Sequence, residues 1–397
     1  MASTEFVLFG LTLLGVVLFH QHTLRVALAG LAGITTYKLL VTGFHGVAGF
    51  AGLGQHLHQQ WVTLANLLGL LLGFAVLARH FEETRLPDLL PNFLPDDWRG
   101  GAVLLLLVFV LSSFLDNIAA AMIGGSVAAT VFRGRVHIGY LAAIVAASNA
   151  GGSGSVIGDT TTTMMWIEGV PASAVLHAYI AAAVALLVFI VPASIQQQRY
   201  SPIVRDAAIG VKIDAGRVVV VALILGAAVA ANIALNLWFT HEGERFPWIG
   251  AAVWVAILAT APWRRPQWSV LPAAAWGSLF LLSLVLGASM MPVERLPAAS
   301  WQTALGLGFL SSVFDNIPLT KLALDAGGYD WGFLAYAVGF GGSMLWFGSS
   351  AGVALSNRFE EAKSVGAWLR GGWHVLLGYV VGFFALLAIL GWHPHVH

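Results

Sequence analysis

Long apolar segments recur along the whole chain of 397 residues, and they limit what it can fold into. Residues 61–78, 173–193, 216–237 and 373–392 each carry at most one charged side chain. A helix needs about 20 consecutive apolar residues to cross the hydrocarbon core of a bilayer. Only 10% of the residues are charged, whereas soluble domains have about 25%. These features predict an all-α polytopic membrane protein.

The composition also excludes several classes of function. The formal net charge is zero, so there is no electrostatic case for a nucleic-acid partner. The chain has no cysteine, which excludes disulfides, thiolate nucleophiles and cysteine-bound metals. It has no His/Glu metal motif and no cysteine nucleophile, so we expect no enzyme activity and no cofactor. The first apolar segment has no preceding positive charge and is expected to be a retained span rather than a signal peptide.

Two apolar segments differ from the others because an Asp-Asn pair interrupts them in the middle. We predict that these segments, 101–131 and 301–328, are re-entrant hairpins that turn at Asp-Asn and leave the membrane by the side they entered. With both treated as hairpins, the clusters of Lys and Arg fall on one side, as the positive-inside rule requires, and both chain ends lie outside. Ten further segments are predicted to cross the membrane, namely 5–20, 24–45, 61–78, 138–167, 173–193, 216–237, 247–262, 272–291, 331–357 and 373–392.

The order of the predicted elements repeats. Residues 1–198 contain three crossings, a hairpin, a broken crossing and a plain crossing, and residues 213–397 contain the same series. The polar stretch 199–212 between them is predicted to be a cytoplasmic linker. Each half has an odd number of crossings, so the second half is expected to be inverted relative to the first. Inverted repeats with a site near the midplane are an architecture of secondary transporters.

Two pairs of similar motifs occupy corresponding places in the two halves. SSFLDNI at 112–118 matches SSVFDNI at 311–317. The glycine-rich stretch GGSGSVIGDT at 151–160 matches GGSMLWFGSS at 341–350. Because both pairs are in register with the predicted topology, they support the repeat.

Polar side chains end the first arm of each predicted hairpin. Asp116 and Asp315 follow apolar runs, and Asn117 and Asn316 come next. A carboxylate at the centre of a membrane helix costs roughly 3 kcal/mol or more, so such residues usually face the protein interior and are functional candidates. Carboxylate, amide and hydroxyl oxygens are hard ligands that suit small alkali cations. Asp and Asn also favour helix N-caps, and capping is compatible with cation binding.

The crossing after each hairpin is predicted to be broken. The glycines of NAGGSGSVIGDT allow the backbone to unwind, and the freed carbonyl groups are candidate cation ligands. Asp159 and Thr160 end this stretch, whereas the second half has Ser349 and Ser350 there. Burial favours the protonated form of a carboxylate, and a nearby cation favours the ionised form. Competition between H⁺ and Na⁺ for Asp159 is therefore the simplest exchange mechanism, and a helix cap is the alternative role.

Lys321 is the cationic residue near a predicted hairpin tip. It lies five residues beyond Asn316, and Asp325 is four residues further along, a spacing that permits an ion pair on one helix face. A structural pair with Asp325 and a role as charge partner of the site both fit this position.

At these residues the sequence resembles the ion transporter superfamily, and within it the NhaD-type sodium/proton antiporters. FLDNIAAAM and FDNIPLT are similar to the two Asp-Asn tips of that family, and NAGGSGSVIGDTTTTMMW and GGSMLWFGSSAGVALS are similar to the segments after them. The resemblance covers roughly 100–170 and 300–357. The sequence departs from the pattern at Lys321, and Ala119 stands where the second tip has Pro318.

The resemblance implies a homodimer in a bacterial inner membrane, with a scaffold of outer spans and a mobile domain that moves in elevator fashion. It also implies exchange of Na⁺ or Li⁺ for H⁺. The site that it implies consists of Asp116, Asn117, Asn149, Asp159, Thr160, Asp315, Asn316, Ser349 and Ser350.

Two functional hypotheses follow. In the first, the chain is a Na⁺/H⁺ antiporter, and protonation and Na⁺ binding exclude each other at Asp116, Asp159 and Asp315. In the second, the same site holds a coupling cation while an organic or oxyanion substrate, such as citrate, a dicarboxylate or arsenite, is transported. Transport that depends on such a substrate, without Na⁺/H⁺ exchange in its absence, would favour the second hypothesis.

Overall fold

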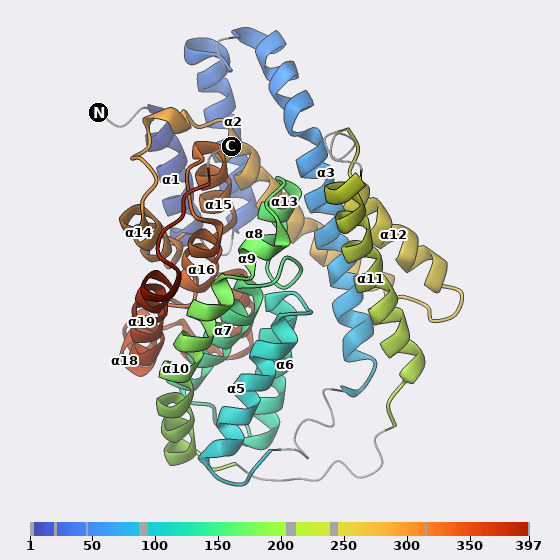
Figure 1. The fold of residues 1–397 in the computed structure, drawn as a ribbon, viewed down its shortest axis with the longest axis vertical. Coiled ribbons are helices and arrows are strands. Elements are labelled where there is room, and N and C mark those ends of the chain that lie inside the picture. Colours follow the sequence, from blue (N-terminus) through green and yellow to red (C-terminus); the bar gives the residue numbers. More distant parts are fainter. Residues whose placement is uncertain are drawn as a thin grey trace.

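A computed structural model describes residues 4–19, 22–44, 47–86, 94–203, 212–238, 245–314 and 316–395 (Figure 1). The described residues form helices and connections, and no strand is present among them apart from an isolated bridge between Phe44 and Val47. Both ends of the drawn chain lie at the upper end of the molecule in Figure 1. The expected all-helical class is therefore confirmed.

Several helices are suited to a bilayer. Within the described residues, five helical segments are long and apolar enough to cross a membrane: Thr23–Thr42, Gly49–Glu82, Ala172–Tyr200, Trp268–Ser289 and Trp373–Leu390. Six shorter apolar helices accompany them in the same part of the chain. These helices agree with the polytopic membrane protein that the sequence predicts.

The first half contains the predicted series of elements. The segment 101–131 is two helices that turn at residues 113–116, and the segment 138–167 is broken between residues 154 and 159. The helices are α1 (Thr4–Leu18), α2 (Thr23–Tyr37) with the π-helix η2 (Lys38–Thr42), α3 (Gly49–Glu82), α5 (Trp98–Ser112), α6 (Asn117–Val131), α7 (Ile138–Ser153), α8 (Thr160–Ile167), α9 (Ala172–Val175) and α10 (Ala178–Tyr200).

The second half repeats this order. The segment 301–328 again forms two helices, and the segment 331–357 is broken between residues 342 and 349. The elements are α11 (Ala215–Trp238), α12 (Trp248–Thr260), η4 (Trp268–Val270), α13 (Leu271–Ser289), η5 (Val293–Arg295), α14 (Trp301–Ser311), α15 (Asn316–Ala326), α16 (Trp331–Gly341), α17 (Ser350–Arg358), η6 (Glu360–Lys363), α18 (Val365–Gly371) and α19 (Trp373–Leu390).

Two boundaries differ from the sequence-based expectation. Helix α3 has 34 residues and is about 51 Å long at 1.5 Å per residue, so it extends well beyond the predicted crossing 61–78 at both ends. Helix α10 continues to Tyr200, so the first two residues of the predicted linker 199–212 are helical. Residues 204–211 of that linker lie outside the described residues.

The helices pack as an inner and an outer group. In the inner group α10 packs against α19, α7 against α16, α5 against α7, and α14 against α16. In the outer group α1 packs against α2 and α11 against α12, while α3 and α13 pack against each other. Figure 1 shows α11 and α12 on the opposite side of the molecule from α10 and α19. The two groups meet where α13 contacts α15 and α3 contacts α8.

The two halves interlock inside the inner group. Helix α6 of the first hairpin packs against α17, which follows the break in the second half. Helix α15 of the second hairpin packs against α8, which follows the break in the first half. The second helix of each hairpin therefore contacts the helix that follows the break in the other half. The inverted orientation of the repeats in a membrane stays a prediction.

Glycines allow the broken crossings to approach the hairpins closely. A Cβ atom at Gly151 in α7 would collide with the backbone carbonyl oxygen of Phe109 in α5. In the second half, a Cβ atom at Gly341 in α16 would collide with the carbonyl oxygen of Gly308 in α14. Both neighbours are backbone atoms and cannot move like the end of a flexible side chain, so these two positions require glycine.

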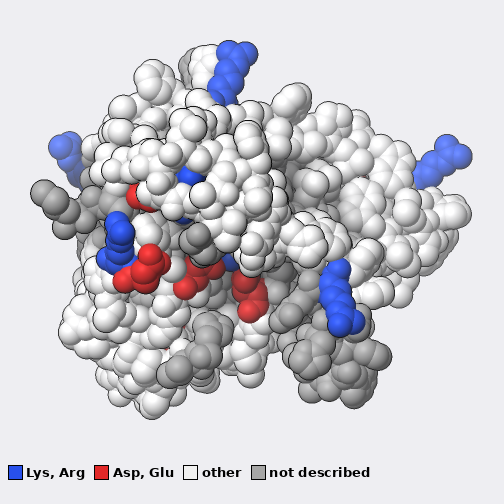
Figure 2. Space-filling model, turned by 90° about the horizontal axis from the view of Figure 1, so that it is seen from above, with Lys and Arg blue, Asp and Glu red and all other residues white. Residues whose placement is uncertain are grey.

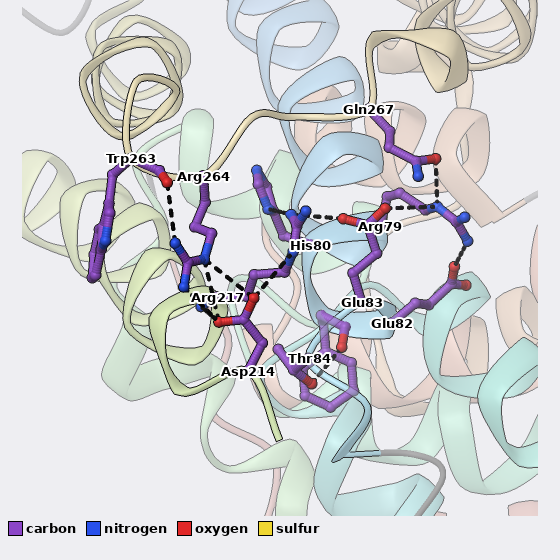
Figure 3. Close-up of polar contacts among 11 residues, drawn as sticks. Arg79, His80, Glu82, Glu83, Thr84, Asp214, Arg217, Trp263, Arg264 and Gln267 are labelled. Carbon is purple, nitrogen blue, oxygen red and sulfur yellow. Dashed lines mark hydrogen bonds and ion pairs between the residues drawn. The ribbon is translucent and has the colours of Figure 1, made fainter. Parts of the chain in front are cut away.

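Ion pairs join the start of α11 to the end of α3 and to the connection after α12 (Figure 3). Arg217 Nη1 lies 2.6 Å from Glu83 Oε2, and Arg264 Nη2 lies 3.1 Å from Asp214 Oδ1. The backbone N–H of Asp214 also donates to the carbonyl oxygen of Thr84 at 3.1 Å. A single ion pair near the surface contributes little to the stability of the fold, but several together hold these connections in one arrangement.

The first prediction concerns the glycine contacts. We expect Gly151→Ala to destabilise the protein by about 1–3 kcal/mol, because the added methyl group forces α7 away from α5. Gly306→Ala in α14 is the matched control, because nothing lies within 4 Å of a Cβ atom there and alanine favours helix. Thermal unfolding in detergent measures both variants. Equal melting temperatures for the two variants would contradict the close approach.

The second prediction concerns pH. The hydrogen bond from Arg264 holds the pKa of Asp214 below its usual range. A carboxyl group with a lowered pKa in the folded state stabilises the protein above its unfolded pKa, and this stabilisation is lost as the pH falls through the folded pKa. We therefore expect the melting temperature of the wild type to decrease when the pH drops below about 4. We expect Asp214→Asn to have a lower melting temperature than wild type at pH 7 and a smaller decrease at acidic pH. Identical profiles between pH 7 and pH 3 would rule the contribution out.

Candidate functional site

The turn of the first hairpin, residues 113–116, places a carboxylate at the start of α6. Asp116 is the N-cap of α6, and its Oδ2 accepts a hydrogen bond from Ile118 N at 3.2 Å. Asn117 follows as the first helical residue and is 3% exposed. Asp caps well because its side chain satisfies an N–H group that has no partner inside the helix. The capping role considered for Asp116 is therefore present.

The second hairpin has a similar start. Asn316 is the first residue of α15 and is buried. Asp315, its predicted partner, lies outside the described residues.

Asp159 occupies the end of the break in the first half. It is the N-cap of α8, and its Oδ1 accepts hydrogen bonds from Thr161 N at 3.1 Å and from the Thr160 hydroxyl at 3.3 Å. Asp159 is buried, with 1% of its surface exposed. The break thus positions a carboxylate inside the inner group of helices.

The threonines after Asp159 bind the unwound backbone. The Thr162 hydroxyl donates to Ser155 O at 2.6 Å, and the Thr163 hydroxyl donates to Val156 O at 3.0 Å. Carbonyl groups of this stretch are the candidate cation ligands, and these two each accept one hydrogen bond. A carbonyl oxygen has two lone pairs, so both groups stay candidates.

The break in the second half ends on a serine instead of a carboxylate. Ser349 is the N-cap of α17, and its hydroxyl oxygen accepts a hydrogen bond from Gly352 N at 3.2 Å. Hydroxyl groups of serine cap helices about as well as carboxylates do. The two breaks therefore end alike in backbone geometry and differ in charge.

Asn149 connects the two halves through its side-chain amide. Its Oδ1 accepts from Asn117 Nδ2 at 3.0 Å. Its Nδ2 donates to Ser343 Oγ at 3.0 Å and to Ser349 Oγ at 3.1 Å. All four side chains are at most 3% exposed. A buried polar network of this kind fixes the side chains only if each polar group finds a partner.

The corresponding positions in the two motifs differ in side-chain length. By the register of GGS at 151–153 with GGS at 341–343, Asn149 corresponds to Gly339, and Asp159 corresponds to Ser349. Asn149 lies against the short Ser349. Asp159 lies against Gly339, since a Cβ atom there would be 3.0 Å from Asp159 Oδ2. Each long polar side chain of the first half thus faces a short residue of the second half.

A cavity of about 420 Å³ reaches three of the predicted site residues. Asp116, Thr160 and Ser350, which stand at or next to the starts of α6, α8 and α17, all line it. The opposite wall comes from α3 and α13 and includes Glu82 and Ser278. The cavity therefore runs along α3 between the outer and inner helix groups and gives access to Asp116.

Lys321 lies in a separate cluster. Its Nζ is 2.7 Å from Asp325 Oδ1 and 3.1 Å from Glu168 Oε1, and its side chain is 3% exposed. Glu168 Oε1 also accepts from the Thr63 hydroxyl in α3 at 3.2 Å. The predicted Lys321–Asp325 pair is confirmed, and its second carboxylate comes from the end of α8. Figure 2 shows acidic side chains gathered in a hollow near the middle of the upper face of the molecule.

Two residues of these networks were not predicted. Ser343 is at the third position of the GGS sequence that was matched to 151–153, so its place in the repeat was a usable signal. Glu168 follows the apolar end of α8, and a carboxylate directly after an apolar helix was a weaker signal.

The caps determine which ions fit the site. A helix N-terminus without a charged cap attracts anions. In α6 and α8, however, carboxylates bind the N–H groups of the first turn, so the local charge is negative. Within the described part of the chain, no three His, Asp or Glu side chains are arranged to hold a metal ion. The side chains at these helix starts offer carboxylate, amide and hydroxyl oxygens, the ligand types that suit alkali ions.

Comparison with known proteins places the chain among transporters. The chain matches a family described as citrate transporter, CitMHS, over residues 4–341. Sodium/proton antiporter 1 of Arabidopsis thaliana is 27% identical in an alignment of 337 positions, which covers 72% of this chain and 55% of that protein. The Na⁺/H⁺ antiporter NhaD of Vibrio cholerae is 27% identical in an alignment of 399 positions, which covers 82% of this chain and 79% of that protein.

A further relative supports the same resemblance. The Na⁺/H⁺ antiporter NhaD of Halomonas elongata is 26% identical in an alignment of 340 positions, which covers 72% of this chain and 66% of that protein. The chain thus spans just over half the length of the Arabidopsis protein and about two thirds of the Halomonas protein. The resemblance to NhaD-type antiporters is confirmed.

The third prediction concerns the amide of Asn149. We expect Asn149→Ala to destabilise the protein by about 1–3 kcal/mol, because it leaves the buried Asn117 amide and the hydroxyls of Ser343 and Ser349 without this partner. Ser148→Ala is the control, since its buried hydroxyl donates only to Val145 O one turn earlier in the same helix. Thermal unfolding in detergent compares the two. A smaller loss for Asn149→Ala than for Ser148→Ala would refute the linking role.

Proposed function

The chain belongs to the citrate transporter family, a family of transporters rather than enzymes, and from this premise we propose that it is a secondary active antiporter exchanging Na⁺ or Li⁺ for H⁺. The relatives named above as sodium/proton antiporters support this assignment. The observation that carries it is the pair of carboxylates, Asp116 and Asp159, that cap α6 and α8.

The carboxylate caps favour a cation over an anion. Asp159 is buried among polar side chains, and Asp116 lines the cavity between α3 and α13. A carboxylate in such a place needs a proton or a cation to balance its charge. Binding of one excludes the other, so a cycle that exposes the site alternately to the two sides of the membrane couples their movements in opposite directions.

The proposed site contains oxygen ligands from both halves. Asp116 and Asp159 carry the charge, and Asn117, Asn149, Thr160, Ser349 and Ser350 supply amide and hydroxyl oxygens. Asp315 and Asn316 of the second hairpin complete the proposed set of cation ligands. The contacts of α6 with α17 and of α8 with α15 mean that movement of either hairpin changes the surroundings of both breaks.

The proposed setting is that of an elevator-type transporter. We place the chain in a bacterial inner membrane as a homodimer with both ends outside, and with two inverted repeats whose hairpins are re-entrant. The division into an inner group of helices, which holds the site, and an outer group around α3 and α13 supports a mobile part and a scaffold.

Cation-coupled transport of an organic or oxyanion substrate is the second candidate. The family description as citrate transporter is the observation that favours it. A citrate-like anion needs positive groups, but Lys321 is already paired with Asp325 and Glu168. Proteoliposome assays with citrate, a dicarboxylate and arsenite added in turn distinguish the two. Uptake of one of these anions, together with an absence of Na⁺/H⁺ exchange, would establish the second function.

The fourth prediction tests the carboxylate in the first break. Asp159→Asn keeps a good helix cap but removes the charge and the titratable proton, so we expect Na⁺-dependent proton flux in proteoliposomes to fall to the background of empty vesicles. A pH-sensitive dye inside the vesicles measures the flux, and melting temperature shows that the variant folds.

Asp330→Asn is the matched control for this experiment. Asp330 is also a buried aspartate at a helix N-cap, and it accepts a hydrogen bond from Gly332 N at 3.0 Å at the start of α16. It lies outside the proposed site, so its variant should retain the flux. Unchanged flux in Asp159→Asn would disprove the role of Asp159.

A further inference from the structure

A second cavity lies away from the proposed ion site, where α7 begins and α10 and α18 end. Its volume is about 690 Å³. Helix α7 is the helix that carries Asn149, and α18 follows α17 and η6. The cavity therefore joins elements of both halves, and neither the exchange mechanism nor the ion site uses it. Its lining residues are Val136, His137, Ile138, Gln196, Arg199, Tyr200, Glu361, Ala367, Arg370 and Gly371.

His137 presents a hydrogen-bond donor at this cavity. Its Nδ1 accepts a hydrogen bond from Gly139 N at 3.1 Å, as the N-cap of α7. Burial lowers the pKa of His137, so the ring is neutral near pH 7. Because Nδ1 is the acceptor, the ring hydrogen is on Nε2, which is then a donor.

The wall around His137 is held in place by neighbouring contacts. Its backbone N–H donates to Gln197 Oε1 at 2.7 Å, and Gln197 Nε2 donates to Arg135 O at 3.1 Å. The His137 ring packs edge-on against Tyr200 at 5.4 Å between centroids, and the Arg135 guanidinium lies 5.4 Å from the centre of the Tyr200 ring. This side of the cavity is thus formed before any ligand binds.

The cavity is rich in cationic donors. Arg199 at the end of α10 and Arg370 at the end of α18 both line it and are exposed. Tyr200 adds a hydroxyl group, and Glu361 is the one carboxylate among the lining residues. Two guanidinium groups, an imidazole N–H and a phenol hydroxyl match the oxygens of a phosphate group, which arginine binds with paired hydrogen bonds.

The rest of the lining is apolar. Val136, Ile138 and Ala367 stand beside the polar donors. A ligand that fits both parts has a phosphate group attached to an apolar body. Basic pockets between membrane helices bind anionic lipid headgroups in this way.

We propose that this cavity binds the phosphate group of an anionic membrane phospholipid, with Arg199, Arg370 and His137 as the donors. The lipid would join the end of α10 to the end of α18 and so hold the two halves together next to the broken crossings. The inference is independent of the transported ion, because lipid binding is measured without transport.

The fifth prediction tests this site in the purified full-length protein. We compare wild type with the double variant Arg199→Gln/Arg370→Gln in nanodiscs of phosphatidylcholine alone or with one fifth phosphatidylglycerol. Retention of phosphatidylglycerol is measured by native mass spectrometry, and melting temperature is measured in parallel. We expect retention to fall about tenfold in the double variant, and the stabilisation by phosphatidylglycerol to disappear.

Two further variants provide the controls. Arg265→Gln removes an exposed arginine outside the cavity and should behave like wild type. Glu361→Gln removes the carboxylate from the cavity and should increase the retention of phosphatidylglycerol. This increase tests the site even if the double variant folds poorly. Equal retention in the wild type and the double variant, or no gain in Glu361→Gln, would overturn the proposal.

The phosphate group bound in the cavity could belong to a lipid or to a soluble phosphate, and adding inorganic phosphate distinguishes these two ligands. With a lipid as the ligand, inorganic phosphate added to wild type in phosphatidylcholine nanodiscs should leave the melting temperature unchanged. Stabilisation by inorganic phosphate that equals the effect of phosphatidylglycerol and disappears in the double variant would show a soluble phosphate ligand and would overturn the assignment to a lipid.

Discussion

The structure depends on how it satisfies backbone N–H groups where helices begin inside the bundle. Each such start leaves N–H groups without partners, and in a membrane-spanning protein each unpaired group costs several kcal/mol. Asp116, Asp159 and Ser349 supply the acceptors for α6, α8 and α17. Folding therefore requires polar oxygens at the places where the helices break. The same caps place the carboxylates of Asp116 and Asp159 inside the bundle, and Asp116 lines a cavity beside α3.

The two motifs are related but not equivalent, and their differences are complementary. Asn149 faces Ser349, and Asp159 faces Gly339, so a long polar side chain meets a short residue in both cases. At Gly339 even a Cβ atom would lie 3.0 Å from Asp159 Oδ2, so the small residue leaves room for the carboxylate. Both long side chains belong to the first half. Asp159 therefore has no carboxylate counterpart at the end of the second break, where Ser349 stands.

The fold and the positions of the breaks could be predicted because they follow from local properties. Apolar length indicates helices, and an Asp-Asn pair or a glycine-rich stretch inside an apolar segment indicates an interruption. The Lys321–Asp325 pair was also predictable, since both residues lie on one helix face. Glu168 was not, because it comes from α8 and reaches Lys321 only through packing of α8 against α15. Ser343 was missed for the same reason, as its partner Asn149 belongs to the other half.

The sequence by itself determined that the chain is a helical membrane protein with two pairs of similar motifs, and it located the polar residues at the turns and breaks. These properties depend on hydrophobicity and backbone preferences, which act over a few neighbouring residues. Only the tertiary structure decided that Asn149 links Asn117 to Ser343 and Ser349, that Asp116 opens on a cavity beside α3, and that two unwound carbonyls are bound by Thr162 and Thr163. Most of these contacts join residues far apart in the chain, and side-chain packing between helices sets their distances.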